Sequence, residues 1–134
     1  FVTKEESDCA FIGLLEHAKS LMEQFDLHYR VVKLPGSDCS DSMARTYDIE
    51  VWLPAEKMYK EVSSISNART YQSRRSNTRY KDEDGKLHFV HTLNGSGLAT
   101  SRLFAAILEQ NQNEDGSIKI PEVLVPFVGT DIII

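Results

Sequence analysis

The stretch from His88 to Gln112 places the strongest constraint on how this chain folds, because it joins a strand, a turn and a helix without interruption. Polar and apolar residues alternate over 87–94, which is the period of a β-strand with two different faces. Asn94-Gly95-Ser96-Gly97 follows as a turn, since glycine accepts backbone conformations that a side chain forbids. Good helix formers then fill 97–112, with Ser96 as a suitable N-cap. We therefore expect a strand, a short polar turn and a helix.

The same patterns predict the rest of the fold. Apolar residues spaced by three and four indicate a helix near 8–25, capped by Ser7 or Asp8, that buries one stripe against a sheet. Runs that suit a pleated surface predict further strands near 28–34, 47–53, 59–66 and 76–81. Together the elements predict an α+β fold, with mostly antiparallel strands and helices packed over them.

Composition limits the classes of protein. A chain of 134 residues forms one domain or less, and its formal net charge of −5 argues against indiscriminate nucleic-acid binding. No apolar run approaches the roughly 20 residues that a membrane span needs. Cys9 and Cys39 are too few for a disulfide framework, so we expect two free thiols.

Two carboxylates share a face of the strand predicted near 47–53. Alternation places Asp48, Glu50 and Trp52 on that face, opposite the apolar side chains. The carboxylates either face water at a sheet edge, or they line a polar cavity suited to an ammonium group or a ribose. The sequence leaves both interpretations open.

One basic segment interrupts the acidic chain. Two tyrosines, Tyr71 and Tyr80, alternate in it with basic residues: Arg69, Arg74, Arg75, Arg79 and Lys81. Such interleaving is found in nucleic-acid-binding proteins. Because the chain is acidic overall and holds only one such cluster, we expect these cations to pair with Glu and Asp inside the molecule.

The last long helix presents an arginine beside the polar turn. Periodicity assigns Leu103, Phe104, Ile107 and Leu108 to its apolar stripe and Arg102 to the other side. Arg102 is then either the solvated arginine of an amphipathic helix or a group offered to an anion.

The run HTLNGSGLATSRLFAAILEQNQNEDGSIKIPEVLVPFVG resembles the third signature motif of the seryl-tRNA synthetases, which are class II aminoacyl-tRNA synthetases. Upstream, YDIEVWLPAEKMYKEVSSISNARTYQSRRSNTRY resembles the strands that precede that motif in the same family. These segments span Tyr47 to Gly129, more than half of the chain. The resemblance implies an α+β fold that is part of a class II catalytic domain.

The resemblance also implies roles for individual residues. Glu61 and Ser64 correspond to residues that hold the Mg²⁺ bound to the ATP phosphates, and carboxylate and hydroxyl oxygens suit that cation. Arg102 corresponds to the catalytic motif arginine that contacts the ATP phosphates, and Asn94 and Ser96 to residues near the substrate serine. Strict alternation puts Glu61 and Ser64 on opposite strand faces, so joint coordination requires a bulge or a strand end between them.

The implied reaction is serine-tRNA ligation, in which serine and ATP form seryl-adenylate and the seryl group passes to tRNA. The resemblance implies a cytoplasmic, homodimeric enzyme with serine, ATP and serine tRNA as partners, and no membrane association. Residues 1–134 are expected to be the C-terminal portion of the catalytic domain, without the tRNA-binding arm and motifs 1 and 2, and inactive alone. Two alternatives are a non-catalytic, synthetase-derived binding module and a small α+β domain that binds an anion through the turn.

Overall fold

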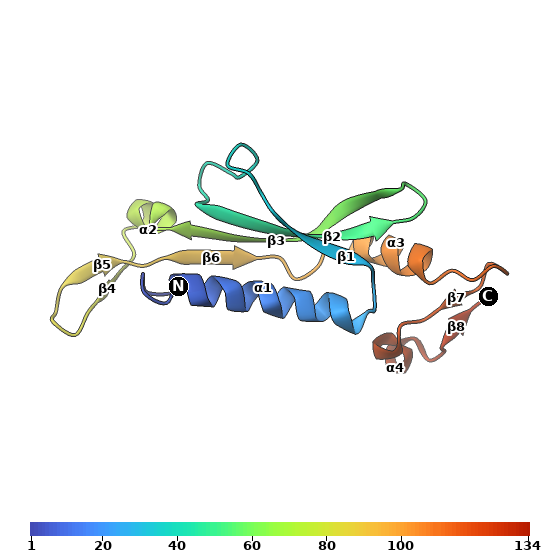
Figure 1. Ribbon diagram of the computed structural model, residues 1–134. Coiled ribbons are helices and arrows are strands. Elements are labelled where there is room, and N and C mark those ends of the chain that lie inside the picture. Colours follow the sequence, from blue (N-terminus) through green and yellow to red (C-terminus); the bar gives the residue numbers. More distant parts are fainter.

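A four-stranded antiparallel sheet with strand order β1-β2-β3-β6 forms the centre of the computed structural model, which describes residues 1–134 (Figure 1). The strands are β1 (Tyr29–Lys33), β2 (Arg45–Leu53), β3 (Met58–Arg69) and β6 (Thr92–Gly95). Two helices, α1 (Ser7–Gln24) and α3 (Thr100–Gln110), pack against this sheet. In Figure 1 the long helix α1 runs beneath the sheet, roughly along its strands.

The hydrophobic core lies between these helices and one face of the sheet. Alternate residues of β2, Ile49, Val51 and Leu53, point into it and are at most 5% exposed. The helices contribute a stripe spaced by three and four residues: Phe11, Leu15, Ala18 and Met22 from α1, with Leu103, Ala106 and Ile107 from α3. The opposite sheet face has no helix over it and carries the polar side chains described below.

The remaining elements are short and lie at the two ends of the molecule (Figure 1). At one end are α2 (Tyr71–Ser76) and a hairpin of β4 (Arg79–Lys81) and β5 (Leu87–Phe89). At the other end are β7 (Ile118–Lys119), the 3₁₀ helix η1 (Glu122–Leu124), α4 (Val125–Val128) and β8 (Ile132–Ile133). No helix is both long enough and apolar enough to span a membrane.

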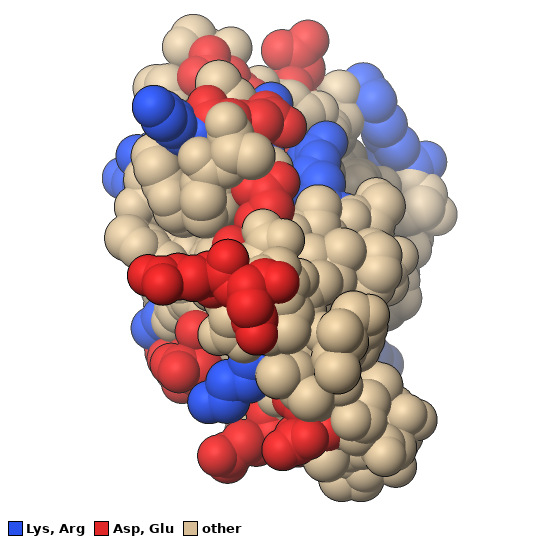
Figure 2. Space-filling view, turned by 90° about the vertical axis from the view of Figure 1, so that its right-hand side faces the viewer, with Lys and Arg blue, Asp and Glu red and all other residues tan.

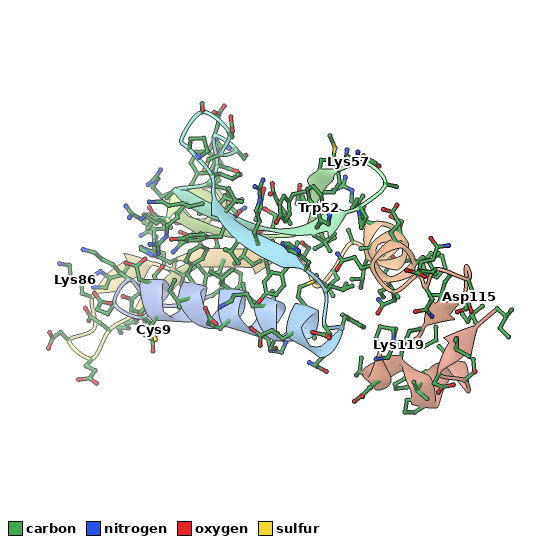
Figure 3. The ribbon with its side chains drawn as sticks, turned by 45° about the vertical axis from the view of Figure 1, so that its right-hand side comes forward. Cys9, Trp52, Lys57, Lys86, Asp115 and Lys119 are labelled. Atoms are coloured by element: carbon green, nitrogen blue, oxygen red, sulfur yellow. The ribbon has the colours of Figure 1, made fainter.

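The predicted α+β class and the antiparallel sheet are confirmed. The helix expected near 8–25 and the strands expected near 28–34, 47–53 and 59–66 each match an element of the structure within a few residues. Cys9 and Cys39 are free thiols, and Figure 3 shows Cys9 on the outer side of α1, away from the sheet.

The single strand predicted over 87–94 is wrong, because two strands with different partners occupy it. β5 pairs with β4, whereas β6 pairs with β3 in the main sheet. Between them His91 forms a bridge with Val2, and the adjacent residues Val90 and His91 are both 8% exposed. Two consecutive buried side chains break the alternation on which the prediction of one strand depended.

The strand predicted over 76–81 is also partly wrong, since α2 occupies its start and only β4 is extended. Six residues are too few to show helical periodicity, so this short helix depends on local hydrogen bonds. Ser73 Oγ donates to the Thr70 carbonyl (3.1 Å), and Asn77 ends the helix in the left-handed region (φ 54°). Asparagine accepts this conformation more readily than most residues.

The predicted helix caps are wrong as well. α1 begins at Ser7 with no side-chain cap, and the Ser7 hydroxyl instead accepts a hydrogen bond from Asn67 Nδ2 (2.9 Å). α3 begins at Thr100 after Ala99, so Ser96 is not its cap. In both cases a contact with β3 uses the hydroxyl that local sequence assigned to the helix terminus.

Candidate functional site

A β-bulge in β3 brings two of the candidate residues onto one face of the sheet. Ile49 lies opposite Ser63, but the next residue of β2, Glu50, lies opposite Glu61, so β3 contains one extra residue, Val62. Ser64 lies opposite Asp48, and Asp48 shares a face of β2 with Glu50. Glu61 and Ser64 therefore share the helix-free face, which is the arrangement that joint coordination of a cation requires.

The glycine-bearing turn before α3 is tied to this bulge by hydrogen bonds from both main chain and side chains. Ser96 N donates to the Ser64 carbonyl (3.2 Å), and the Ser96 hydroxyl accepts from Ser64 N (2.9 Å). Ser63 Oγ donates to the Ser96 carbonyl (2.7 Å), and Ala99 N donates to the Val62 carbonyl (2.6 Å). The turn and the bulge thus form one hydrogen-bonded unit, although 32 or more residues separate them in sequence.

Arg102 extends this unit by one turn of α3. Its Nη1 donates to the main-chain oxygen of Glu61 (2.5 Å), and the guanidinium makes no ion pair. Arg102 also lines an open hollow of about 320 Å³ with Lys60 and Ser101. The remaining N–H groups of its planar fork have no protein partner, which leaves them free for an anion.

Asn94 and Ser96 lie next to each other along the same face but differ in their contacts. Asn94 is exposed at the end of β6, opposite Ser66, and its Nδ2 lies 3.8 Å from the Met43 sulfur. The Ser96 hydroxyl accepts the hydrogen bond from Ser64 N, so its own proton remains free to be donated, either to Ser63 Oγ at 3.5 Å or to a ligand.

The two carboxylates of β2 also belong to this face, and they are not at an edge, because β2 lies between β1 and β3. Glu50 forms an ion pair with Arg30 (2.6 Å). Asp48 is 8% exposed, and its Oδ1 is buried without a hydrogen-bond partner. Of the two interpretations that the sequence left open, the exposed edge is therefore wrong.

An aromatic cluster, which the sequence did not predict, lies at one end of the helix-free face of the sheet. Trp52 and Tyr59 pack edge to face with ring centroids 5.1 Å apart, and the Tyr59 hydroxyl lies 2.7 Å from His28 Nε2. Arg30 covers the Tyr59 ring at 4.1 Å. Figure 3 shows Trp52 on the side of the sheet away from α1. Only the cross-strand register, which pairs Trp52 with Tyr59, brings these residues together.

The chain itself supplies two side chains whose oxygen atoms could be ligands of a divalent cation. Glu61 is exposed and its carboxylate has no ion-pair partner, and the Ser64 hydroxyl has no hydrogen-bond partner. No cluster of three or more His, Cys, Asp or Glu residues could hold a metal ion. One carboxylate and one hydroxyl fit Mg²⁺ whose other ligands are phosphate oxygens and water, the usual composition of nucleotide-bound Mg²⁺ sites.

These features define a class of protein. Its antiparallel sheet has helices on one face, and the other face is polar and is joined to the glycine-bearing turn and to Arg102 of α3. Residues 1–111 match the family described as tRNA synthetase class II core domain (G, H, P, S and T), and the chain belongs to that family.

Within the family, the chain is similar to serine–tRNA ligases. It is 56% identical over 129 residues to the serine–tRNA ligase of Chlamydia felis, covering 96% of this chain and 30% of that protein. It is 54% identical over 132 residues to serine–tRNA ligase 2 of Clostridium acetobutylicum, covering 98% and 31%. The resemblance seen in the sequence is confirmed, and the chain spans about 30% of the length of these curated relatives.

Solved structures agree with this assignment. The seryl-tRNA synthetase from Pyrococcus horikoshii complexed with ATP superposes with a TM-score of 0.93 at 40% identity, covering 99% of this chain and 30% of that one. The cytoplasmic serine–tRNA ligase from Naegleria fowleri in complex with AMP superposes with a TM-score of 0.87 at 30% identity, covering 97% and 31%. The whole chain therefore has the fold of the corresponding part of these enzymes.

Proposed function

We propose that the chain is part of a serine–tRNA ligase and carries one half of the site that forms seryl-adenylate. The observation that supports this most is the bulge-and-turn unit, which groups Glu61, Ser64 and Arg102 as the resemblance requires. In the reaction a serine carboxylate oxygen bonds to the α-phosphorus of ATP, and pyrophosphate leaves. The seryl group then passes to the 3′ end of serine tRNA.

The ATP subsite is proposed to consist of these three side chains. Glu61 and Ser64 would hold Mg²⁺, which neutralises charge on the phosphates. Arg102 would donate its free N–H groups to the same phosphates, while Nη1 stays bonded to the Glu61 carbonyl. Because phosphoryl and adenylyl transfers need positioning and charge stabilisation more than covalent help, cations fixed on a rigid sheet are suited to the task.

The serine subsite is proposed to include Asn94 and Ser96. The free proton of the Ser96 hydroxyl and the exposed amide of Asn94 can hydrogen-bond a small polar substrate. An alanine in place of serine would leave such groups unpaired, which is how polar sites reject apolar analogues.

We further propose that residues 1–134 correspond to the C-terminal portion of the catalytic domain and do not catalyse alone. The open form of the site supports this: of the hollows in the molecule, only the one at Arg102 includes a candidate residue, and the helix-free sheet face has no opposing wall. The intact enzyme is proposed to be a cytoplasmic homodimer, with serine, ATP and serine tRNA as its partners.

Isothermal calorimetry of the folded chain with Mg-ATP, and with a non-hydrolysable seryl-adenylate analogue, tests the proposal. We expect binding that Arg102→Ala weakens at least about tenfold, since a hydrogen bond to a charged group contributes about 1.5–3 kcal/mol. Lys86→Ala is the matched control, because it removes one positive charge from the distant β4–β5 hairpin (Figure 3).

Two results would count against the proposal. Equal weakening by Lys86→Ala and Arg102→Ala would show general charge attraction instead of a site. Absence of binding by a chain that is folded by circular dichroism would favour the alternative, a non-catalytic module derived from a synthetase.

A further inference from the structure

The basic segment does not pair with acidic residues, contrary to the expectation from the sequence. The ion pairs of the chain use other cations: Lys19, Arg30, Arg45, Lys60 and His88. The cations of the segment are exposed and unpaired: Arg69, Arg74, Arg75, Arg79 and Lys81. In a chain of net charge −5, this group of unpaired cations is available to an external anion.

Two open hollows meet at the start of this segment and share Arg69 and Thr70. The first, of about 380 Å³, also holds Arg74, whose Nη1 donates to Thr70 Oγ1 (2.7 Å). The second, of about 400 Å³, also holds Lys4 and His91 and has no apolar side chain in its lining. We call the surface formed by Lys4, Arg69, Arg74 and Arg75 the basic edge.

The backbone holds Arg69 in this position at a conformational cost. Its φ of 48° lies in the left-handed region, which a long side chain rarely occupies. Arg69 N donates to Asn67 Oδ1 (2.8 Å), and Asn67, which is 2% exposed, is itself fixed by the Ser7 hydroxyl. A buried network therefore maintains the strained residue that separates the two hollows.

Two further groups fit an anion at this edge. His91 lines the second hollow, and its Nδ1 is buried without a hydrogen-bond partner. Burial, followed by the charges of Arg69 and Lys4, lowers the pKa of His91, while Glu5 and Asp8 act in the opposite direction. The guanidinium carbon of Arg75 lies over the ring of Tyr71, 4.1 Å from its centroid, so this cation rests on an aromatic surface at the edge.

Glu5 and two aspartates also lie near the edge. Asp41 lines the first hollow and Asp8 the second, but Asp8 already forms an ion pair with Arg45 (2.6 Å). At the far end of the molecule, Figure 2 shows Asp and Glu side chains together with Lys and Arg across the face that carries α4 and the C-terminus. The linings of the two hollows contain three cations, Lys4, Arg69 and Arg74, against these two aspartates.

We propose that the basic edge binds phosphate groups of an RNA backbone, with Arg69 between two bound phosphates or next to one of them. Arginine and lysine that neutralise phosphates, with an aromatic ring beside them, are the usual means of holding a single-stranded backbone. The choice of RNA as the polyanion rests on the proposed function. The surface itself is defined by the unpaired cations and does not involve Glu61, Ser64 or Arg102.

Fluorescence anisotropy with a labelled single-stranded RNA of 12 nucleotides, over a series of salt concentrations, tests this surface without ATP or serine. Arg69→Gln and Arg74→Gln are each expected to weaken binding about tenfold and to reduce the salt slope by about 0.7, because each removes about one released counterion. Lys119→Gln is the matched control, since it removes one charge at the opposite end (Figure 3). Because Arg69 is strained, Arg74→Gln and Arg75→Gln keep the test decisive if Arg69→Gln fails to fold.

Inorganic phosphate and polyglutamate are the competing ligands. Tighter binding of RNA than of either, lost in the edge variants and kept in Lys119→Gln, supports the proposal. Phosphate that binds as tightly as RNA would assign the edge to free phosphate, and polyglutamate that binds equally would assign it to acidic protein; either overturns it. An unsubstituted chain that binds Mg-ATP but does not bind RNA would overturn this inference and leave the proposed function intact.

Discussion

Arg102 on α3 and Glu61 on β3 are joined by a hydrogen bond from Nη1 to the main-chain carbonyl oxygen (2.5 Å). The bond leaves the Glu61 carboxylate free, because it uses the backbone of that residue. One side chain therefore fixes the distance between the helix cation and the strand anion. The proposed phosphate contact and the proposed cation ligand are positioned by a single contact.

Arg102→Lys separates charge from geometry. Lysine keeps the positive charge but lacks the planar fork, so it cannot bond the Glu61 carbonyl and a phosphate in the same arrangement. We expect Mg-ATP affinity, measured by calorimetry, to fall about tenfold despite the retained charge. Unchanged affinity in Arg102→Lys would mean that only the charge of this residue matters.

The two serines of the bulge should respond differently to truncation. Ser63 is 1% exposed and its hydroxyl donates to the Ser96 carbonyl, so Ser63→Ala is expected to lower the free energy of unfolding by about 1 kcal/mol. The Ser64 hydroxyl has no protein partner, so Ser64→Ala is expected to leave stability unchanged and to weaken ATP binding only when Mg²⁺ is present. Urea unfolding and calorimetry with and without Mg²⁺ distinguish the two, and the reverse pattern would contradict both assignments.

The contribution of α1 to the core can be measured at two adjacent residues. Phe11 is fully buried, and its ring centroid lies 5.6 Å from that of Tyr47 on β2. Phe11→Ala should lower the free energy of unfolding by about 3–5 kcal/mol, the usual effect of such a cavity. Ile12 is 42% exposed, so Ile12→Ala is the control and should change stability far less. Similar losses would show that α1 does not pack as described.

His91 should make stability depend on pH. Because burial lowers the pKa of His91 below its ordinary value of 6.5, the unfolded chain takes up a proton at this residue more readily than the folded chain. The stability gained from the neutral imidazole is fully present above pH 6.5 and decreases as the pH falls through the folded-state pKa. Urea midpoints at pH 7.5 and 5.5 should differ less in His91→Gln than in the exposed control His17→Gln. Equal differences in both variants would refute this role.

Most of the fold could be predicted from the sequence, because its main elements have strong periodicity. The apolar stripe of α1 and the alternation of β2 identify the buried faces directly. The prediction was wrong for α3 at Phe104, which is 62% exposed, whereas Ala106 is fully buried. Hydrophobicity favours Phe104, but α3 turns Ala106 toward the core, where it lies with Leu103 and Ile107.

The site could be predicted only in part, since its residues come from segments that periodicity treats separately. A bulge between Glu61 and Ser64 was required by the roles that the resemblance gave them, and the structure contains one. The buried carboxylate of Asp48 and the aromatic cluster around Tyr59 depend on cross-strand register. The unpaired cations of the basic edge depend on which acids are already engaged elsewhere, which only a three-dimensional arrangement can show.

The extra residue in β3 makes the length of this strand as important as its composition. Deleting Val62 would restore regular pairing with β2 and leave Glu61 opposite Glu50 and Ser64 opposite Asp48, on the same face. The deletion would, however, remove a side chain from the apolar core and the carbonyl that accepts the hydrogen bond from Ala99 N, so the turn before α3 would lose an anchor. Substitutions at Val62 that keep an apolar side chain do not change the number of residues in β3. This part of the chain should therefore tolerate changes of residue type far better than deletions.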